Sequence, residues 1–134
     1  GLMSAARSWH AMTRLKDGRI MIAGGYNANE DLATTEILNP ASNQWVVSGS
    51  MNSIRYGHTL TTLVDGRVLA AGGVNGTNQA LASTELWAPI ATTWSLTSPM
   101  SSPRYYHTAL RLFDGRVLIA GGMNDLDTPL GSVN

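Results

Sequence analysis

The feature that most constrains how this chain can fold is a motif that occurs three times at a nearly constant spacing. Its copies are RSWHAMTRLKDGRIMIAGG at Arg7–Gly25, RYGHTLTTLVDGRVLAAGG at Arg55–Gly73 and RYYHTALRLFDGRVLIAGG at Arg104–Gly122. The copies start 48 and 49 residues apart. A repeat of this length indicates one supersecondary unit per repeat, packed against its neighbours. The sequence therefore predicts one repeat domain over residues 1–134, with repeats at 7–54 and 55–103 and an incomplete one at 104–134.

Other residues keep the same period, so chance does not explain it. They are His10, His58 and His107, the pairs Gly24–Gly25, Gly72–Gly73 and Gly121–Gly122, the acids Glu36 and Glu85, and the tryptophans Trp45 and Trp94.

Each repeat reads as four short β-strands, which predicts an all-β fold. In the second repeat, hydrophobicity alternates over residues 57–64, as expected of a strand. The run 67–72 is apolar on both faces and predicts an interior strand. Asp65-Gly66 lies between them and predicts a two-residue type I′ hairpin, in which both residues have positive φ. Further strands are expected at 82–88 and 93–97, and in the first repeat at 34–39 and 44–47.

Together these features resemble the kelch repeat. The resemblance lies in Arg-x-x-His, the glycine pair after an apolar strand, and a Glu followed by a strand, a Pro and a Trp. It implies a β-propeller in which each repeat is one blade of four antiparallel strands around a central channel. The Asp-Gly-Arg hairpin resembles bacterial kelch proteins and the central domain of galactose oxidases. The chain departs from the pattern at Leu38 and Trp87, where many kelch repeats have Tyr.

The repeats supply about two and a half blades. Propellers close with about four to eight blades. We therefore expect these 134 residues to be a fragment, or the ordered part, of a larger propeller whose other blades come from the same or another chain.

Composition excludes several classes of function. Charged residues are only 13% of the chain, and nine basic side chains balance nine acidic ones without a run of either sign, so a basic nucleic-acid interface is not expected. The absence of Cys excludes disulfides and thiolate metal sites. No apolar run approaches the roughly 20 residues that span a bilayer. The largely uncharged polar composition favours an exported, extracellular or cell-surface protein over a cytosolic one.

The recurring motif residues are interpreted as structural. We expect each Arg to bond to carbonyls or to Glu36 or Glu85, each His to cap a strand and bond to backbone, and each Glu to join neighbouring blades. We expect the glycines to allow close backbone approach and the tryptophans to pack in the core. The aromatic residues inside the motif are Trp9, Tyr56, Tyr105 and Tyr106; packing is favoured for them over a carbohydrate-binding face.

The loops that follow the glycine pairs are the predicted binding sites, because variable loops on a rigid scaffold commonly carry binding. Their candidate residues are Tyr26, Asn27, Asn29, Asp31, Asn75, Asn78, Asn124, Asp125 and Asp127. No metal or cofactor is expected.

The predicted function is a non-catalytic scaffold that binds a protein or a glycan through these loops. The alternative is a fragment of a galactose-oxidase-like copper radical oxidase or of another kelch-type carbohydrate enzyme. The resemblance to that oxidase implies a Cys cross-linked to Tyr, and this chain contains no Cys. No catalytic residue is therefore assigned.

Overall fold

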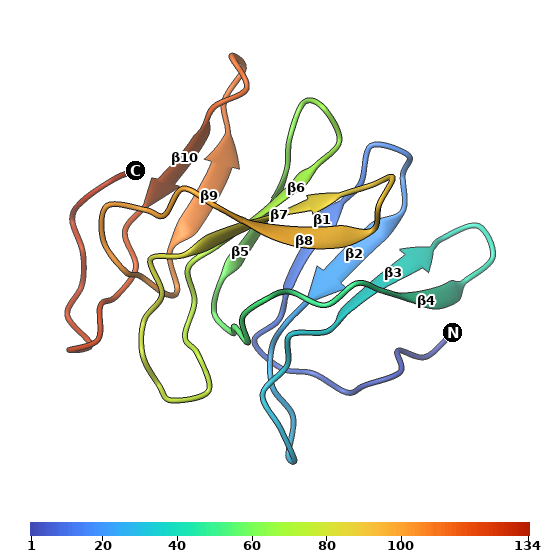
Figure 1. Ribbon diagram of the computed structural model, residues 1–134, viewed down its shortest axis with the longest axis horizontal. Helices are drawn as coiled ribbons and strands as arrows, with labels where there is room; N and C mark the ends of the chain where they lie inside the picture. The colour runs from blue at the N-terminus through green and yellow to red at the C-terminus, as the bar shows by residue number, and fades with distance from the viewer.

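The computed structural model describes residues 1–134 and contains three antiparallel sheets of four, four and two strands (Figure 1). The first sheet consists of β1 (Ala11–Arg14), β2 (Ile20–Ala23), β3 (Thr35–Asn39) and β4 (Gln44–Ser48). The second consists of β5 (Thr59–Thr62), β6 (Val68–Ala71), β7 (Thr84–Ala88) and β8 (Thr93–Thr97). The third consists of β9 (Thr108–Arg111) and β10 (Val117–Ala120). The predicted all-β blades are confirmed, and each sheet pairs its strands in chain order.

The hairpins between the first two strands of each sheet differ from the prediction. In the first repeat Gly18 has a φ of 88°, whereas Asp17 is not among the residues with positive φ. The amide of Gly18 donates to the carbonyl of Leu15 at 3.0 Å. This is a tight turn followed by a left-handed glycine, as in a three-residue hairpin. The type I′ prediction was wrong because Asp17 uses its side chain to accept from the amide of Arg19 and stays out of the left-handed region.

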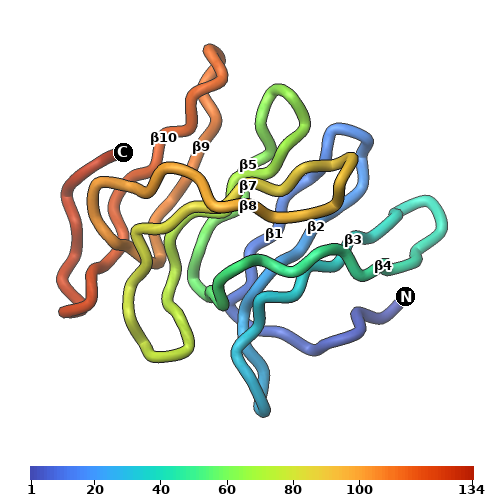
Figure 2. The backbone as a smooth tube through the Cα atoms, in the orientation of Figure 1, coloured from blue at the N-terminus to red at the C-terminus, as the bar shows by residue number.

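The sheets follow one another like adjacent blades. Their first strands, β1, β5 and β9, lie next to one another, while β4 and β8 form the outer edges (Figures 1 and 2). The Asp-Gly hairpins lie at one end of the molecule, called here the hairpin end. The loops 26–31, 74–80 and 123–129 lie at the opposite end, called the loop face (Figure 2). No helix in the structure has the length and apolar character needed to cross a membrane.

The main core lies between the first two sheets. Met21, Val68 and Trp87 are fully buried there. The indole of Trp94 donates to the hydroxyl of Thr35 at 3.1 Å, which joins the outer strand of the second sheet to the first sheet. Trp45, its repeat counterpart, is only half-buried. Trp87 is the largest fully buried side chain. This could not be predicted from the repeats, because Leu38 stands at the equivalent position of the first repeat.

Candidate functional site

The arginine that opens each repeat is buried inside its own blade. One nitrogen of Arg55 donates to the carbonyls of Gly72 and Ser83, at 2.7 and 3.1 Å. Another donates to a carboxylate oxygen of Glu85 at 2.8 Å, and both side chains are fully buried. Arg7 and Glu36 repeat this arrangement at 2.8 Å. The ion pairs thus lie within blades and not between neighbouring blades.

Glu85 also holds the segment that leads into its blade. Its oxygens accept from the backbone amides of Asn52 and Ser53, at 2.6 and 3.0 Å. Burial acts to raise the pKa of Glu85, but the bonds from Arg55 and Asn52 outweigh it and leave the pKa lowered. Arg55 and Glu85 are therefore occupied by the blade and are not presented to a ligand.

The glycine pair of each repeat receives the next blade. The amide of Gly73 donates to the carbonyl of Arg104 at 2.9 Å, and that of Gly25 to the carbonyl of Arg55 at 2.9 Å. Gly72 has a φ of 64°, and a Cβ placed on it would lie 2.7 Å from the Cε1 of His107. Only glycine fits such a close approach of two backbones in this conformation.

His58 and His107 lie at the same junctions, and His58 does not bond as expected. His107 Nε2 lies 3.0 Å from the hydroxyl of Thr59 in the preceding blade. His58 is buried, and neither ring nitrogen has a hydrogen-bond partner. The position equivalent to Thr59 in the first blade is Ala11, which offers no hydroxyl. The predicted backbone cap was therefore wrong for His58, because its neighbour lacks the polar group that serves His107.

Replacing Ala11 with Thr is expected to stabilise the protein by about 1 kcal/mol, because it gives the buried His58 nitrogen a partner. Chemical denaturation would measure the change. Ala11→Val is the matched control, since Val has the shape of Thr without the hydroxyl. Equal unfolding free energies for the Thr and Val variants would show that the hydroxyl adds nothing.

Acid is expected to weaken the fold through these histidines. Burial lowers the pKa of His58 from 6.5 to about 3 and that of His107 to about 4. Below about pH 6.5 these two histidines are therefore protonated in the unfolded chain but remain neutral in the folded chain. Stability should be complete above that pH and fall towards the folded pKa values, by up to about 1.4 kcal/mol per pH unit for each His. Denaturation midpoints that are equal at neutral and mildly acidic pH would contradict this.

The asparagines of the predicted binding loops mostly serve the loops themselves. The side-chain oxygen of Asn75 accepts from the amides of Thr77 and Gln79, at 2.9 and 3.0 Å. Asn27 and Asn124 accept from their own loops in the same way. These three residues therefore shape the loop face, whereas Asn29, in the first loop, is exposed.

The aromatic motif residues gather on the loop face, together with Tyr26. All four tyrosines of the chain and Trp9 take part. The rings of Trp9 and Tyr106 have centroids 4.7 Å apart and are 51% and 42% exposed. Gly57 stands at the equivalent position between them in the repeat order, and a Cβ there would come within 2.7 Å of the Tyr106 ring. The missing side chain of Gly57 lets Tyr106 reach Trp9.

The backbone beneath this pair is continuous across three blades. The amide of Gly57 donates to the carbonyl of Trp9, and the amide of Tyr106 donates to the carbonyl of Gly57, both at 2.9 Å. Trp9 and Tyr106 have φ values of 56° and 54°, which is uncommon for residues with a side chain. The two exposed rings are thus carried by backbone segments that hydrogen bonds join from blade to blade. Their exposure differs from the packing role that the sequence favoured.

A cavity of about 390 Å³ lies beside the pair on the loop face. It is lined by Tyr56, Val74, Asn78, Tyr105, Tyr106, Met123, Asp125 and Asp127. Tyr56 donates to Asn78 at 2.7 Å, and Tyr105 donates to Asp127. The bond to Asp127, and secondarily burial, raises the pKa of Tyr105 to about 12. Asp125 accepts from the amide of Ala80 and so joins the second and third loops.

The remaining candidate residues surround this cavity. The ring of Tyr26 lies 5.4 Å from that of Tyr56, edge to face. Asp31, in the first loop, is close enough to Tyr56 to contribute to raising its pKa, after burial. Nowhere in the structure do three or more His, Asp or Glu side chains group in a way that could hold a metal ion.

Comparison with known protein families assigns a family to this chain. The sequence matches the family described as the kelch motif over residues 16–52 and 55–101, together more than half of the chain. No curated protein matches the sequence. The first matched segment covers β2 to β4 of the first sheet, and the second covers all four strands of the second sheet. The chain belongs to the kelch-repeat family.

Proposed function

We propose that this chain is a non-catalytic binding scaffold whose loop face takes up a protein segment or a glycan. The observation that carries the proposal is the exposed Trp9–Tyr106 pair beside a cavity of about 390 Å³. Aromatic side chains held rigidly at a surface lose little conformational entropy on binding, and Trp and Tyr are enriched among residues that dominate binding energy.

A protein segment is the first candidate, because kelch repeats commonly mediate protein interactions. Extended peptides have amides and carbonyls that Asn78 and Asp125, at the cavity, would complement. A glycan is the second candidate, and the exposed pair of Trp9 and Tyr106 rings specifically favours it. A sugar ring can pack its apolar face on such rings while its hydroxyl groups bond to amide and carboxylate side chains.

The absence of catalysis is part of the proposal and rests on where the histidines lie. His58 and His107 are buried at blade junctions, and none of the three histidines lines the loop-face cavity. The copper-oxidase alternative therefore draws no support from the arrangement of side chains. Copper-dependent production of peroxide from galactose by this chain would contradict the proposal.

The proposal is tested by selecting ligands from a displayed-peptide library and a glycan array and measuring their affinities for variants. Trp9→Ala and Tyr106→Ala are each expected to weaken binding about tenfold or more, as is typical when an aromatic anchor is removed. Both replacements keep a side chain in the left-handed conformation, so backbone strain is unchanged.

The matched control is Phe113→Ala, which removes an exposed aromatic ring from the hairpin end. The affinity of the Phe113→Ala variant for the selected ligands should equal that of the unchanged protein. Ligands that bind the Trp9 and Tyr106 variants as tightly as the unchanged protein would place binding elsewhere and refute the proposal.

A further inference from the structure

The charges of this chain are separated between its two ends, although they sum to zero. Six acidic and basic side chains are paired at the hairpin end, as Asp17–Arg19, Asp65–Arg67 and Asp114–Arg116. Arg7 and Arg55 are paired with Glu36 and Glu85 inside the blades, and Arg104 is buried. The acids that remain without an ion pair are Glu30, Asp31, Asp125 and Asp127, all in loops of the loop face.

The exposed bases without an ion pair are Arg14, Lys16 and Arg111. All three line one cavity of about 750 Å³ at the hairpin end, where the first strands of the three sheets meet. Asp17 also lines this cavity, but Arg19 holds its carboxylate at 2.7 Å. The cavity is therefore lined by three positive charges that no protein carboxylate neutralises. A concave surface with charges of one sign concentrates the field and attracts ligands of the opposite sign.

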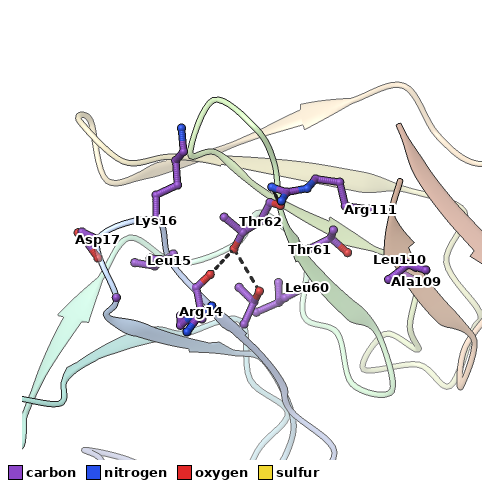
Figure 3. A pocket seen from close by; sticks show the side chains of 12 residues that line it. Arg14, Leu15, Lys16, Asp17, Leu60, Thr61, Thr62, Ala109, Leu110 and Arg111 are labelled. Carbon is purple, nitrogen blue, oxygen red and sulfur yellow. Dashed lines mark hydrogen bonds between the residues drawn. The ribbon is translucent and has the colours of Figure 1, made fainter. Parts of the chain in front are cut away.

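The walls of this cavity are braced by hydrogen bonds that centre on Thr62 (Figure 3). The guanidinium of Arg111 donates to the carbonyl of Thr62 at 2.9 Å, which ties the third blade to the second. The hydroxyl of Thr62 donates to the carbonyl of Arg14 at 2.7 Å and lies 3.1 Å from the hydroxyl of Thr13. Arg111 is thus held at the cavity with one donor used and its other donors free.

Figure 3 shows Thr62 between Lys16 on one side and Arg111 on the other. We propose that this cavity is a second binding site, separate from the loop face, and that it takes a small oxyanion such as a phosphate, sulfate or carboxylate compound. The Arg111 fork matches the two oxygens of such a group, and Lys16 supplies a further positive charge. The hydroxyl of Thr61 lines the same space and can donate to a further oxygen, whereas the hydroxyl of Thr13 already donates to that of Thr62. The volume of this cavity is within the range of small-molecule sites, about 300–1,000 Å³.

Calorimetric titration with inorganic phosphate, sulfate and citrate, each at the same ionic strength, tests this site. Saturable binding of at least one probe is expected, and the strongest probe identifies the class of oxyanion. Arg111→Gln and Lys16→Gln should each weaken it about tenfold, because each removes a charge-assisted hydrogen bond. Arg67→Gln is the matched control: it removes the same charge from the same end of the molecule, but Arg67 does not line the cavity. The affinity of the Arg67→Gln variant for the probe should change less than about twofold.

The unchanged protein offers a second measurement that does not depend on how the variants fold. In NMR spectra, added phosphate should shift the amide signals of Thr61, Thr62 and Arg111 and leave those of Asn27 and Asn75 on the loop face in place. Three outcomes would overturn the proposal: no saturable binding of any probe, an equal loss in Arg67→Gln and Arg111→Gln, or shifts confined to the loop face. The loop-face ligand is tested separately by the Trp9 and Tyr106 variants, since the two sites share no residue.

Discussion

Replacing Glu85 with Ala is expected to lower the free energy of unfolding by about 3–5 kcal/mol, because it leaves a buried charge without its partner. Arg55 is fully buried, and Glu85 is the only carboxylate that contacts it. The amides of Asn52 and Ser53 lose their acceptor in the same substitution. Urea denaturation followed by Trp fluorescence would measure the loss. Glu85→Gln should lose less, since its amide oxygen still accepts hydrogen bonds.

The third repeat supplies the matched control for this substitution. Asn134 occupies the position of Glu85 there, and its side-chain oxygen accepts only from the amide and hydroxyl of Ser101, at 3.0 and 2.6 Å. Arg104 donates instead to the hydroxyls of Ser102 and Ser132, each at 2.9 Å. Asn134→Ala should therefore cost only about 1 kcal/mol. If both alanine variants lose the same stability, the ion pair does not hold the blade.

The strands were predictable because their signals are local. The recurrence of Asp-Gly between apolar runs, and of Pro40 and Pro89 after the third strands, marks where strands stop whatever surrounds them. The predicted first strand at 57–64 nevertheless shortens to Thr59–Thr62 in the structure. Gly57 is in the left-handed region, and Leu63 already belongs to the hairpin, where its amide donates to Arg67. Such boundaries depend on backbone conformations that composition does not specify.

The surface features were not predictable, because each depends on residues far apart in sequence. Whether Trp9 is buried depends on Tyr106, nearly a hundred residues later, and on Gly57 leaving room between the two repeats. The one available signal was that a glycine alternates with two large aromatic residues at the same repeat position. Similarly, the sequence does not show that Arg111 lacks an ion pair. That depends on the hairpin aspartates, each of which pairs with the arginine of its own Asp-Gly-Arg hairpin.

The opening arginine of each repeat has two structural roles, one inside its own blade and one at the contact with the preceding blade. The side chain of each opening arginine bonds within its own blade, as Arg104 does to Gly121 at 2.7 Å. Its carbonyl meanwhile accepts from the glycine pair of the blade before, as Arg104 does from Gly73 at 2.9 Å. The same arginine therefore stabilises its own blade and binds the preceding one. A substitution in the glycine pair should weaken both sets of contacts.

Replacing Gly72 with Ala tests this link. Its new Cβ would collide with the carbonyl of Arg104 and lie 2.7 Å from His107 Cε1, in a backbone with a φ of 64°. Ala in the left-handed region costs about 1–2 kcal/mol by itself. The collision between packed backbones should add about 1–3 kcal/mol, as overpacking typically does. Chemical denaturation would give the total.

Gly121→Ala separates the two contributions. Gly121 has nearly the same φ, 69°, but the nearest atom to a Cβ there is the carbonyl oxygen of Leu130 at 3.8 Å, an ordinary contact. It should therefore bear the conformational cost alone, and the difference between the two variants measures the contact between the second and third blades. That difference should also appear as faster hydrogen exchange at the Gly73 amide, which bonds across the junction. If the two variants lose equal stability, the glycine pair is required only for its backbone conformation and not for the approach of the next blade.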